Sequence, residues 1–203
     1  KKLIMDVNKN TYTFSFAVIM VVIVAAILSS TYIALKPYQD RNIELEKKQN
    51  ILSSIGISVL RDSADLIYPS YIKEDIVLNW KGQQVEGSAF DLDLSVELKK
   101  DKQEQLLPLF ISQVNSQKKY IIPLRGTGLW GPIWGFIALE DDLDNVYGAV
   151  FDHKAETPGL GAEINRSFFE DQFAGKRIFK DNELVSVVVV KGGASPNSLY
   201  EVD

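Results

Sequence analysis

The sequence predicts an α+β protein with one N-terminal transmembrane helix, a helical stalk and a domain built on a mixed or antiparallel sheet. The run from Tyr12 to Leu35 holds no charged residue, apolar residues recur at helical spacings from Lys36 to Leu60, and strand-like runs dominate from Leu66 onward. We therefore expect four parts: a short arm at 1–12, a transmembrane helix at 13–35, a stalk at 36–62 and a domain at 63–203.

The uncharged run is long enough to cross a membrane. Phe14 to Ile33 consists mostly of Phe, Val, Ile, Ala, Met and Leu, and at about 1.5 Å per residue it matches a hydrocarbon core of about 30 Å. Tyr12 and Tyr32 lie near its two ends, where interfacial aromatic residues gather. A cleaved signal peptide is the alternative, but its apolar core is shorter and ends at a small-residue cleavage site that has no clear match here. We expect a retained anchor.

Charges on the two flanks predict the orientation of this anchor. The N-terminal arm carries three lysines and one aspartate, whereas the other flank mixes lysine and arginine with aspartate and glutamate. Lysine and arginine concentrate on the cytoplasmic side of membrane proteins. The purer positive cluster therefore predicts that the arm is inside and the domain outside.

The stalk is expected to be an amphipathic helix. Pro37 lies where the membrane span can bend or end. The helix either packs on its own domain or sets the height of the domain above the bilayer, and both can hold. Apolar residues recur at mixed spacings that include three and four positions, with Glu and Lys between them: Ile43, Leu45, Ile51, Leu52, Ile55 and Val59.

The domain is expected to hold several strands and one short helix. Asp91–Leu98 alternates polar and apolar residues, as in a strand with one wet face. The unalternating valines within 184–190 predict a strand covered on both faces. A helix is expected over 167–173, with Ser167 as its cap and Gly175 at its end. Further strands are expected at 119–124, 134–139 and 146–152.

Composition excludes several classes of function. The chain has a net charge of −5, of which residues 1–12 contribute +2, so that the part beyond Leu35 carries −7 and does not suit a nucleic acid partner. The chain contains no cysteine, which excludes disulfides, thiolate nucleophiles and cysteine-bound iron–sulfur clusters within it.

Familiar catalytic and metal motifs are also missing. His153 is the only histidine, so a multi-histidine metal site is impossible, and we expect it to be a solvent-facing or hydrogen-bonded loop residue. The chain has no Gly-x-Ser-x-Gly elbow, P-loop or dinucleotide-binding fingerprint. The acidic cluster at 140–144 lacks the spacing of a calcium loop, and a solvated hairpin loop is expected there. We predict no catalytic side chain and no metal.

Two glycine-rich turns stand out between Gly126 and Gly161. One reads Gly126-Thr-Gly-Leu-Trp-Gly131 and the other Glu156-Thr-Pro-Gly-Leu-Gly161. Glycine lets a backbone come close to a flat or phosphorylated ligand, and tryptophan offers a rigid apolar face. Each turn alone suits a tight β-turn with packed aromatics. Their combination favours a surface that faces a ligand.

Flavin suits these residues, because a cofactor brings chemistry that the side chains lack. Leu129, Trp130 and Leu160 can form apolar walls for an isoalloxazine ring. Hydroxyl, backbone N–H and cationic groups suit a ribityl chain and a phosphate. The candidates for these polar contacts are Thr157, Gly159, Gly161 and Lys191.

Both turns resemble the FMN-binding domain of two membrane redox complexes. One is the sodium-translocating NADH:quinone reductase, in its C subunit, and the other is the ferredoxin:NAD reductase, in its G subunit. Thr127–Gly131 and Glu156–Gly161 carry the resemblance, and the second motif is the more specific. Residues 34–42 and 47–52 resemble the post-membrane helix of the C subunit more closely than that of the G subunit. The resemblance adds Glu156 to the expected FMN-binding residues.

In this family FMN is attached by a phosphoester bond to a threonine in a motif of the form Asp-x-x-Ser/Thr-Gly-Ala-Thr. Gly192-Gly-Ala-Ser195 is a near match, but Ser195 fails as the acceptor because position 189 is Val and position 192 is Gly. On the alignment that the resemblance favours, Val202-Asp203 begins the motif. The acceptor threonine is therefore expected beyond Asp203.

The resemblance implies an electron-carrying flavoprotein in a complex that moves electrons from NADH to ubiquinone and transports sodium. It implies a single-pass protein of the bacterial inner membrane, with the domain on the periplasmic side. Its partners would be the other subunits, especially B, D and E, with an iron–sulfur centre as donor and a second FMN as acceptor, and it would not be active alone. The alternatives are the G subunit of the ferredoxin-linked complex and a membrane-anchored interaction module without a cofactor.

Overall fold

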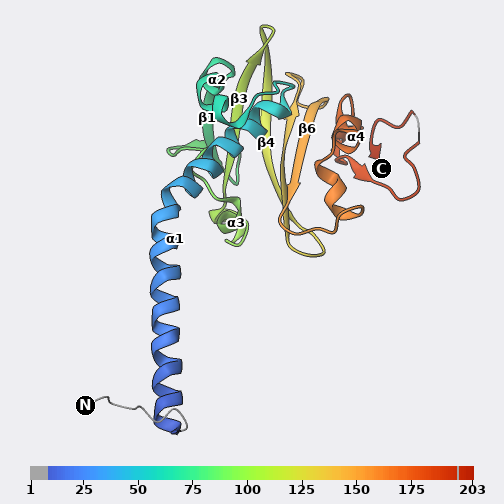
Figure 1. Ribbon diagram of the computed structural model, residues 1–203. Coiled ribbons are helices and arrows are strands. Elements are labelled where there is room, and N and C mark those ends of the chain that lie inside the picture. The colour runs from blue at the N-terminus through green and yellow to red at the C-terminus, as the bar shows by residue number, and fades with distance from the viewer. Residues whose placement is uncertain (1–8, 196) are drawn as a thin grey trace. The chain divides into compact units, whose positions relative to one another are not determined.

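A long helix, α1 (Asn10–Ser54), opens the described part of the computed structural model, which comprises residues 9–195 and 197–203 (Figure 1). Most of the arm expected at 1–12 lies outside the described residues. Pro37 lies inside α1 and does not end it. A proline removes only one backbone hydrogen bond of a helix, and the helix continues on both sides of it. Among the described residues, α1 is the helix that is long and apolar enough to cross a membrane.

The chain divides into two compact units after Glu44, so the last turns of α1 belong to the sheet domain. Ile51 and Leu52 are fully buried there, as is Ile55 just beyond the helix. Gly56, at a φ of 75°, ends the helix, and the N–H of Ile57 donates to the carbonyl of Leu52 at 3.0 Å. The predicted stalk pattern therefore holds residues that pack in the core of the domain.

In the described residues, an antiparallel sheet of six strands forms the centre of the domain, in the order β2-β1-β3-β4-β5-β6. Asn115 and Ser116 both have positive φ at the β3–β4 hairpin, as a tight two-residue turn requires. The strands are β1 (Ile72–Asn79), β2 (Gln84–Val85), β3 (Leu106–Val114), β4 (Gln117–Thr127), β5 (Pro132–Leu139) and β6 (Val146–His153).

Short elements surround this sheet (Figure 1). The helical ones are η1 (Arg61–Ser63), α2 (Ala64–Tyr71), α3 (Leu94–Glu97), η2 (Lys102–Glu104), η3 (Gly161–Asn165), α4 (Ser167–Glu170) and η4 (Asp171–Phe173). The C-terminal part adds the short strands β7 (Phe179–Lys180), β8 (Glu183–Leu184), β9 (Val188–Val189) and β10 (Glu201–Val202).

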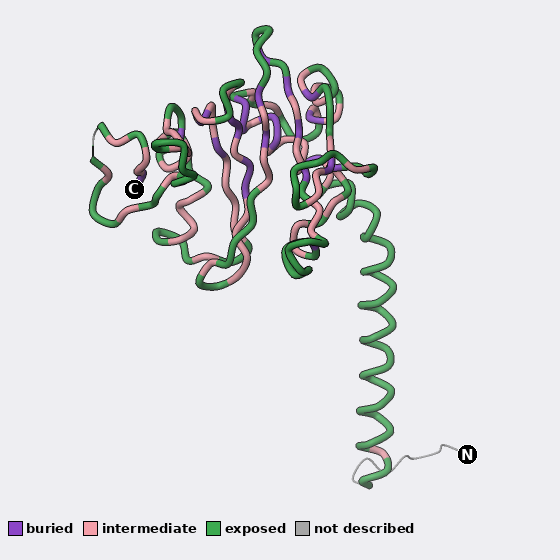
Figure 2. Tube along the Cα trace, turned by 180° about the vertical axis from the view of Figure 1, so that it is seen from behind, coloured by how far each residue is buried: buried purple, intermediate pink, exposed green. Residues whose placement is uncertain are grey.

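The described residues form two buried clusters, and Figure 2 shows buried positions along the central strands. On β5, Phe136 and Ala138 belong to the cluster that contains the end of α1, whereas Ile137 and Leu139 belong to the other. This alternation follows from the two-residue period of a strand. The second cluster also contains Phe173 of η4 together with Val146, Ala149 and Val202.

The structure confirms the α+β class and places the strands expected at 119–124, 134–139 and 146–152 within β4, β5 and β6. The strand expected at Asp91–Leu98 is wrong. Asp93 instead caps α3, accepting the N–H of Ser95 at 2.7 Å. An aspartate that bonds to the backbone two residues on favours a helix start over a strand, whatever the alternation of its neighbours.

The single covered strand expected at 184–190 does not form: Leu184 ends β8, Val188 and Val189 form β9, and these strands are not covered on both faces. Ser186 has a φ of 63°, which interrupts the run, and Val188 and Val189 remain 49% and 60% exposed. The helix expected at 167–173 is present as α4 and η4, but Ser167 is its first residue and Arg166 precedes it as the cap. Gly175, at a φ of 75°, follows its end.

Candidate functional site

The first glycine-rich turn connects β4 to β5. The N–H of Gly128 donates to the carbonyl of Gly131 at 2.7 Å, which closes the turn directly after the Thr127–Pro132 pair of the sheet. Leu129 and Trp130 occupy the tip and are 83% and 64% exposed. Two large apolar side chains therefore face outward at the end of a rigid hairpin.

The second turn follows β6 at the same end of the sheet, since His153 of β6 pairs with Ile133 near the start of β5 (Figure 1). The carbonyl of Thr157 accepts the N–H groups of Leu160 at 3.1 Å and Ala162 at 3.2 Å. Gly159 has a φ of 76°, which this turn requires and which other residues rarely adopt. The turn is thus a fixed backbone structure ahead of η3.

Leu160 is 73% exposed on the second turn, and Thr157 is exposed beside it. A Cβ atom at Gly159 would meet open space. Exposed apolar side chains that gather at one end of a domain indicate a binding surface more than a scatter of single ones does. The predicted apolar wall residues therefore lie exposed on two neighbouring turns.

Glu156 joins the two turns directly. Its Oε1 accepts the backbone N–H of Trp130 at 2.9 Å, across 26 residues of sequence. Its own N–H donates to Nδ1 of His153 at 3.2 Å, so His153 is hydrogen-bonded as expected, although it is the last residue of β6 and does not lie in a loop. The motif predicted Glu156 as a ligand-binding residue, but no sequence pattern indicated this link to Trp130.

Among the described residues, no hydrogen bond joins Lys191 to either turn. Lys191 is exposed after β9, where the N–H of Val190 donates to the carbonyl of Val202 at 2.8 Å. The hydrogen bonds of the described residues join the two turns to each other and leave Lys191 with the C-terminal segment. The structure therefore brings seven of the eight predicted binding residues together on the turns.

The end of β10 is held firmly. Val202 is fully buried, and the side-chain amide of Gln172 accepts the N–H of Asp203 at 2.9 Å and donates to its carbonyl at 2.7 Å. Two matched hydrogen bonds to one residue fix both its position and its direction. Sequence reasoning missed Gln172, since a glutamine in a short helix carries no recognisable pattern.

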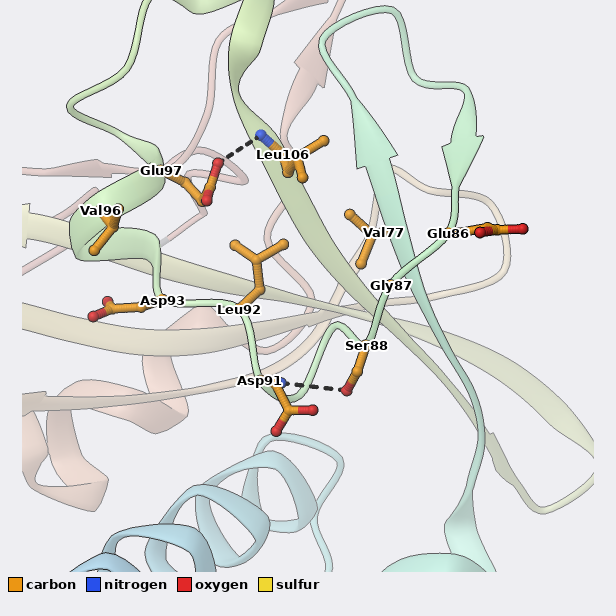
Figure 3. Close-up of a pocket in the computed structure, with 10 residues that line it drawn as sticks. All are labelled: Val77, Glu86, Gly87, Ser88, Asp91, Leu92, Asp93, Val96, Glu97 and Leu106. Carbon is orange, nitrogen blue, oxygen red and sulfur yellow. Dashed lines mark hydrogen bonds between the residues drawn. The ribbon is translucent and has the colours of Figure 1, made fainter.

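A separate hollow lies on the part of the domain near β1 and α3 (Figure 3). Val77, Leu92 and Leu106 form part of its lining, and carboxylates stand around it. Hydrogen bonds from Ser95 hold the pKa of the Asp93 carboxyl below its usual range, and Lys100 does the same for the pKa of Glu97. Charged carboxylates repel a phosphate, so this hollow does not suit FMN.

Comparisons with known proteins identify an FMN-binding domain in the second half of the chain. The model of the FMN-binding domain family matches residues 128–203, which begin at the first turn. The C subunit of the Na(+)-translocating NADH-quinone reductase of Vibrio anguillarum is 32% identical over 206 residues, covering 93% of this chain and 80% of that protein. The same subunit of Vibrio vulnificus strain YJ016 is 28% identical, covering 94% of this chain and 82% of the relative.

Solved structures show the same fold. The crystal structure of the C subunit of the Na(+)-translocating NADH-quinone reductase from Parabacteroides distasonis is 43% identical, with a TM-score of 0.77 over 83% of each chain. That of Shewanella oneidensis NqrC has a TM-score of 0.66 at 21% identity, covering 79% of this chain and 82% of the other. The second likeness concerns the fold alone.

Proposed function

We propose, since this chain belongs to the C-subunit family of the Na(+)-translocating NADH-quinone reductase, that it is the membrane-anchored flavoprotein subunit of such a complex. The observation that carries the proposal is the pair of hydrogen-bonded turns that presents Leu129, Trp130 and Leu160 outward. The matching region of the FMN-binding family begins at these turns.

The residues present fit FMN. Leu129, Trp130 and Leu160 would cover the isoalloxazine ring, because each is large, apolar and exposed. The Thr157 hydroxyl and the backbone N–H of Gly161 would bind the polar edge of the ring or the ribityl chain, because the N–H groups of Gly159, Leu160 and Ala162 already donate within the turn. Lys191 would balance the charge of the phosphate.

When bound, FMN supplies reversible uptake and release of electrons. The side chains of this protein would bind and orient it, and the three apolar residues would keep water from the faces of the ring. No side chain of the turns is required to transfer a proton. Activity is therefore expected only within the assembled complex.

The wider role follows from the resemblance. An iron–sulfur centre would donate electrons and a second FMN would accept them, with the B, D and E subunits as neighbours and ubiquinone as the final acceptor. The domain would lie on the periplasmic side of a bacterial inner membrane, anchored by the apolar part of α1. We place the sodium path in the assembly and propose no sodium site in this chain.

Covalent attachment is tested by mass spectrometry of the protein purified from its native host. We expect an FMN-sized adduct on a peptide that follows Asp203, at a threonine in a Ser/Thr-Gly-Ala-Thr context. The same preparation should show visible flavin absorbance and contain an NADH-oxidising partner. An adduct on Ser195 contradicts the attachment, a ferredoxin-oxidising partner indicates the G subunit of the ferredoxin-linked complex, and a colourless protein indicates an interaction module.

Thr157→Val is expected to leave the fold intact and to shift the FMN midpoint potential. The residue before a proline favours extended geometry, which turns the hydroxyl of Thr157 away from its own turn. The loss of one hydrogen bond to the flavin changes its binding free energy by about 0.5–1.5 kcal/mol. Potentiometric titration of the purified complex measures this shift. An unchanged potential together with normal quinone reduction removes Thr157 from the site.

A further inference from the structure

Glu156 has a geometry unlike that of a residue that contacts a ligand. Its Oε1 is occupied by the N–H of Trp130 at 2.9 Å, and its side chain is half-buried between the turns. Its backbone is held from the other side, because its N–H donates to His153 at 3.2 Å. The carboxylate is therefore directed into the protein, at the backbone of the opposite turn.

Glycines on both turns make room for this carboxylate. A Cβ atom at Gly128 would collide with Oε1 of Glu156. At Gly161 the three nearest atoms all belong to Glu156, with Oε2 at 2.8 Å, Cβ at 3.3 Å and Cγ at 3.4 Å. Neither residue has a backbone conformation reserved for glycine. The space taken by Glu156 therefore accounts for glycine at these two positions.

We propose that Glu156 is a positioning residue that holds the two turns together as one flavin-binding surface, without touching the flavin itself. The inference rests on the proposed function, since it concerns how that site is built. A charge-assisted hydrogen bond to a backbone N–H is stronger than a neutral one. This bond fixes the distance between Trp130 on one turn and Leu160 on the other before any ligand binds.

Glu163 provides a matched comparison. Its Oε1 accepts the N–H of Gly159 at 2.8 Å, so it is also a carboxylate bound to a backbone N–H in this region. It lies four residues from its donor and stabilises the second turn alone. Removing Glu163 should disturb that turn and leave the first turn unaffected, whereas removing Glu156 should release the first turn.

The Trp130 amide reports this link without any flavin. The chain has three tryptophans, so the full-length protein in detergent, labelled with ¹⁵N-tryptophan, gives a short set of NMR signals. In Glu156→Ala the Trp130 amide proton should move upfield, and its exchange with solvent should quicken by about tenfold or more. Glu156→Gln retains an acceptor oxygen and should keep most of the protection, while Glu163→Ala should match the wild type.

Gly161→Ala tests the same idea with Glu156 still present. The added methyl group would meet the end of a flexible carboxylate, which should move away from Trp130 at little cost in stability. Gly161→Ala should therefore reproduce the amide shift of Glu156→Ala, and the double variant should show no further change. This agreement would support positioning by the carboxylate, and a normal Trp130 amide in Gly161→Ala would contradict it.

Flavin-loaded complexes complete the test. Glu156→Ala and Gly161→Ala should alter the visible circular dichroism of the flavin, and Glu156→Gln should stay near the wild type. The positioning role is overturned if Glu156→Ala changes the flavin but not the Trp130 amide, or if Glu156→Gln changes the flavin as much as Glu156→Ala. A wild-type complex without flavin contradicts the proposed function instead, and the amide signal still decides the role of Glu156.

Discussion

Leu52→Ala is expected to lower the free energy of unfolding of the sheet domain by about 2–5 kcal/mol. Leu52 lies in the last turns of α1, is fully buried, and belongs to the cluster that contains Phe110. Its truncation removes apolar contacts and leaves a cavity in that cluster. Urea unfolding of the purified protein in detergent, followed by tryptophan fluorescence, measures the change.

Leu66→Ala is the matched control for this experiment. Leu66 lies in α2 of the same domain and is 82% exposed, so the same truncation should change stability by no more than about 0.5 kcal/mol. If Leu52→Ala lowers the free energy of unfolding no more than Leu66→Ala does, the end of α1 is not part of the core. The contrast therefore tests whether the helix that carries the apolar run is built into the domain.

Glu140→Ala is expected to destabilise the domain by about 3–5 kcal/mol, because it leaves a buried ammonium group without its counter-ion. The side chain of Lys119 is only 1% exposed, and its Nζ forms an ion pair with Glu140. The same Nζ donates to Gln117 at 3.1 Å and lies 4.5 Å from the ring centroid of Tyr147. These two neutral partners replace little of the attraction that a carboxylate supplies.

Lys119→Met separates the cost of an unpaired charge from the value of the ion pair. Methionine keeps much of the apolar stem without the charge, and the partner carboxylate, 34% exposed, can return to water. We expect a smaller loss for Lys119→Met than for Glu140→Ala, and the double variant Lys119→Met/Glu140→Ala should recover stability relative to Glu140→Ala alone. Equal losses in the two single variants would rule out an unpaired buried ammonium as the cause.

The parts of the fold that the sequence predicted correctly have strong local signals. An uncharged apolar run predicts a long helix whatever surrounds it, and the runs within β4, β5 and β6 are rich in β-branched and aromatic residues. The predicted strands failed to form where a single polar residue outweighs the hydrophobic pattern of its neighbours. Asp93 converts an alternating run into a capped turn of helix, and Ser186 interrupts a run of valines.

The candidate site shows the same division. The sequence predicts the two glycine-rich turns and the apolar residues at their tips, because such turns depend on glycines a few positions apart. The hydrogen bond from Trp130 to Glu156 is not, since it joins residues 26 positions apart whose proximity depends on the register of β5 against β6. Only its charge predicts Lys191 as a binding residue, and the described contacts do not link it to the turns.

The sequence by itself determined the apolar helix, the α+β class and the two glycine-rich turns, because each depends on residues close together in the chain. Only the tertiary structure decided that Ile51 and Leu52 belong to the domain core, that Lys119 is buried beside Glu140, and that Glu156 faces the protein and not open solvent. Burial and long-range hydrogen bonds depend on which distant segments meet. The packing of the whole sheet decides which distant segments meet, and no local sequence pattern predicts it.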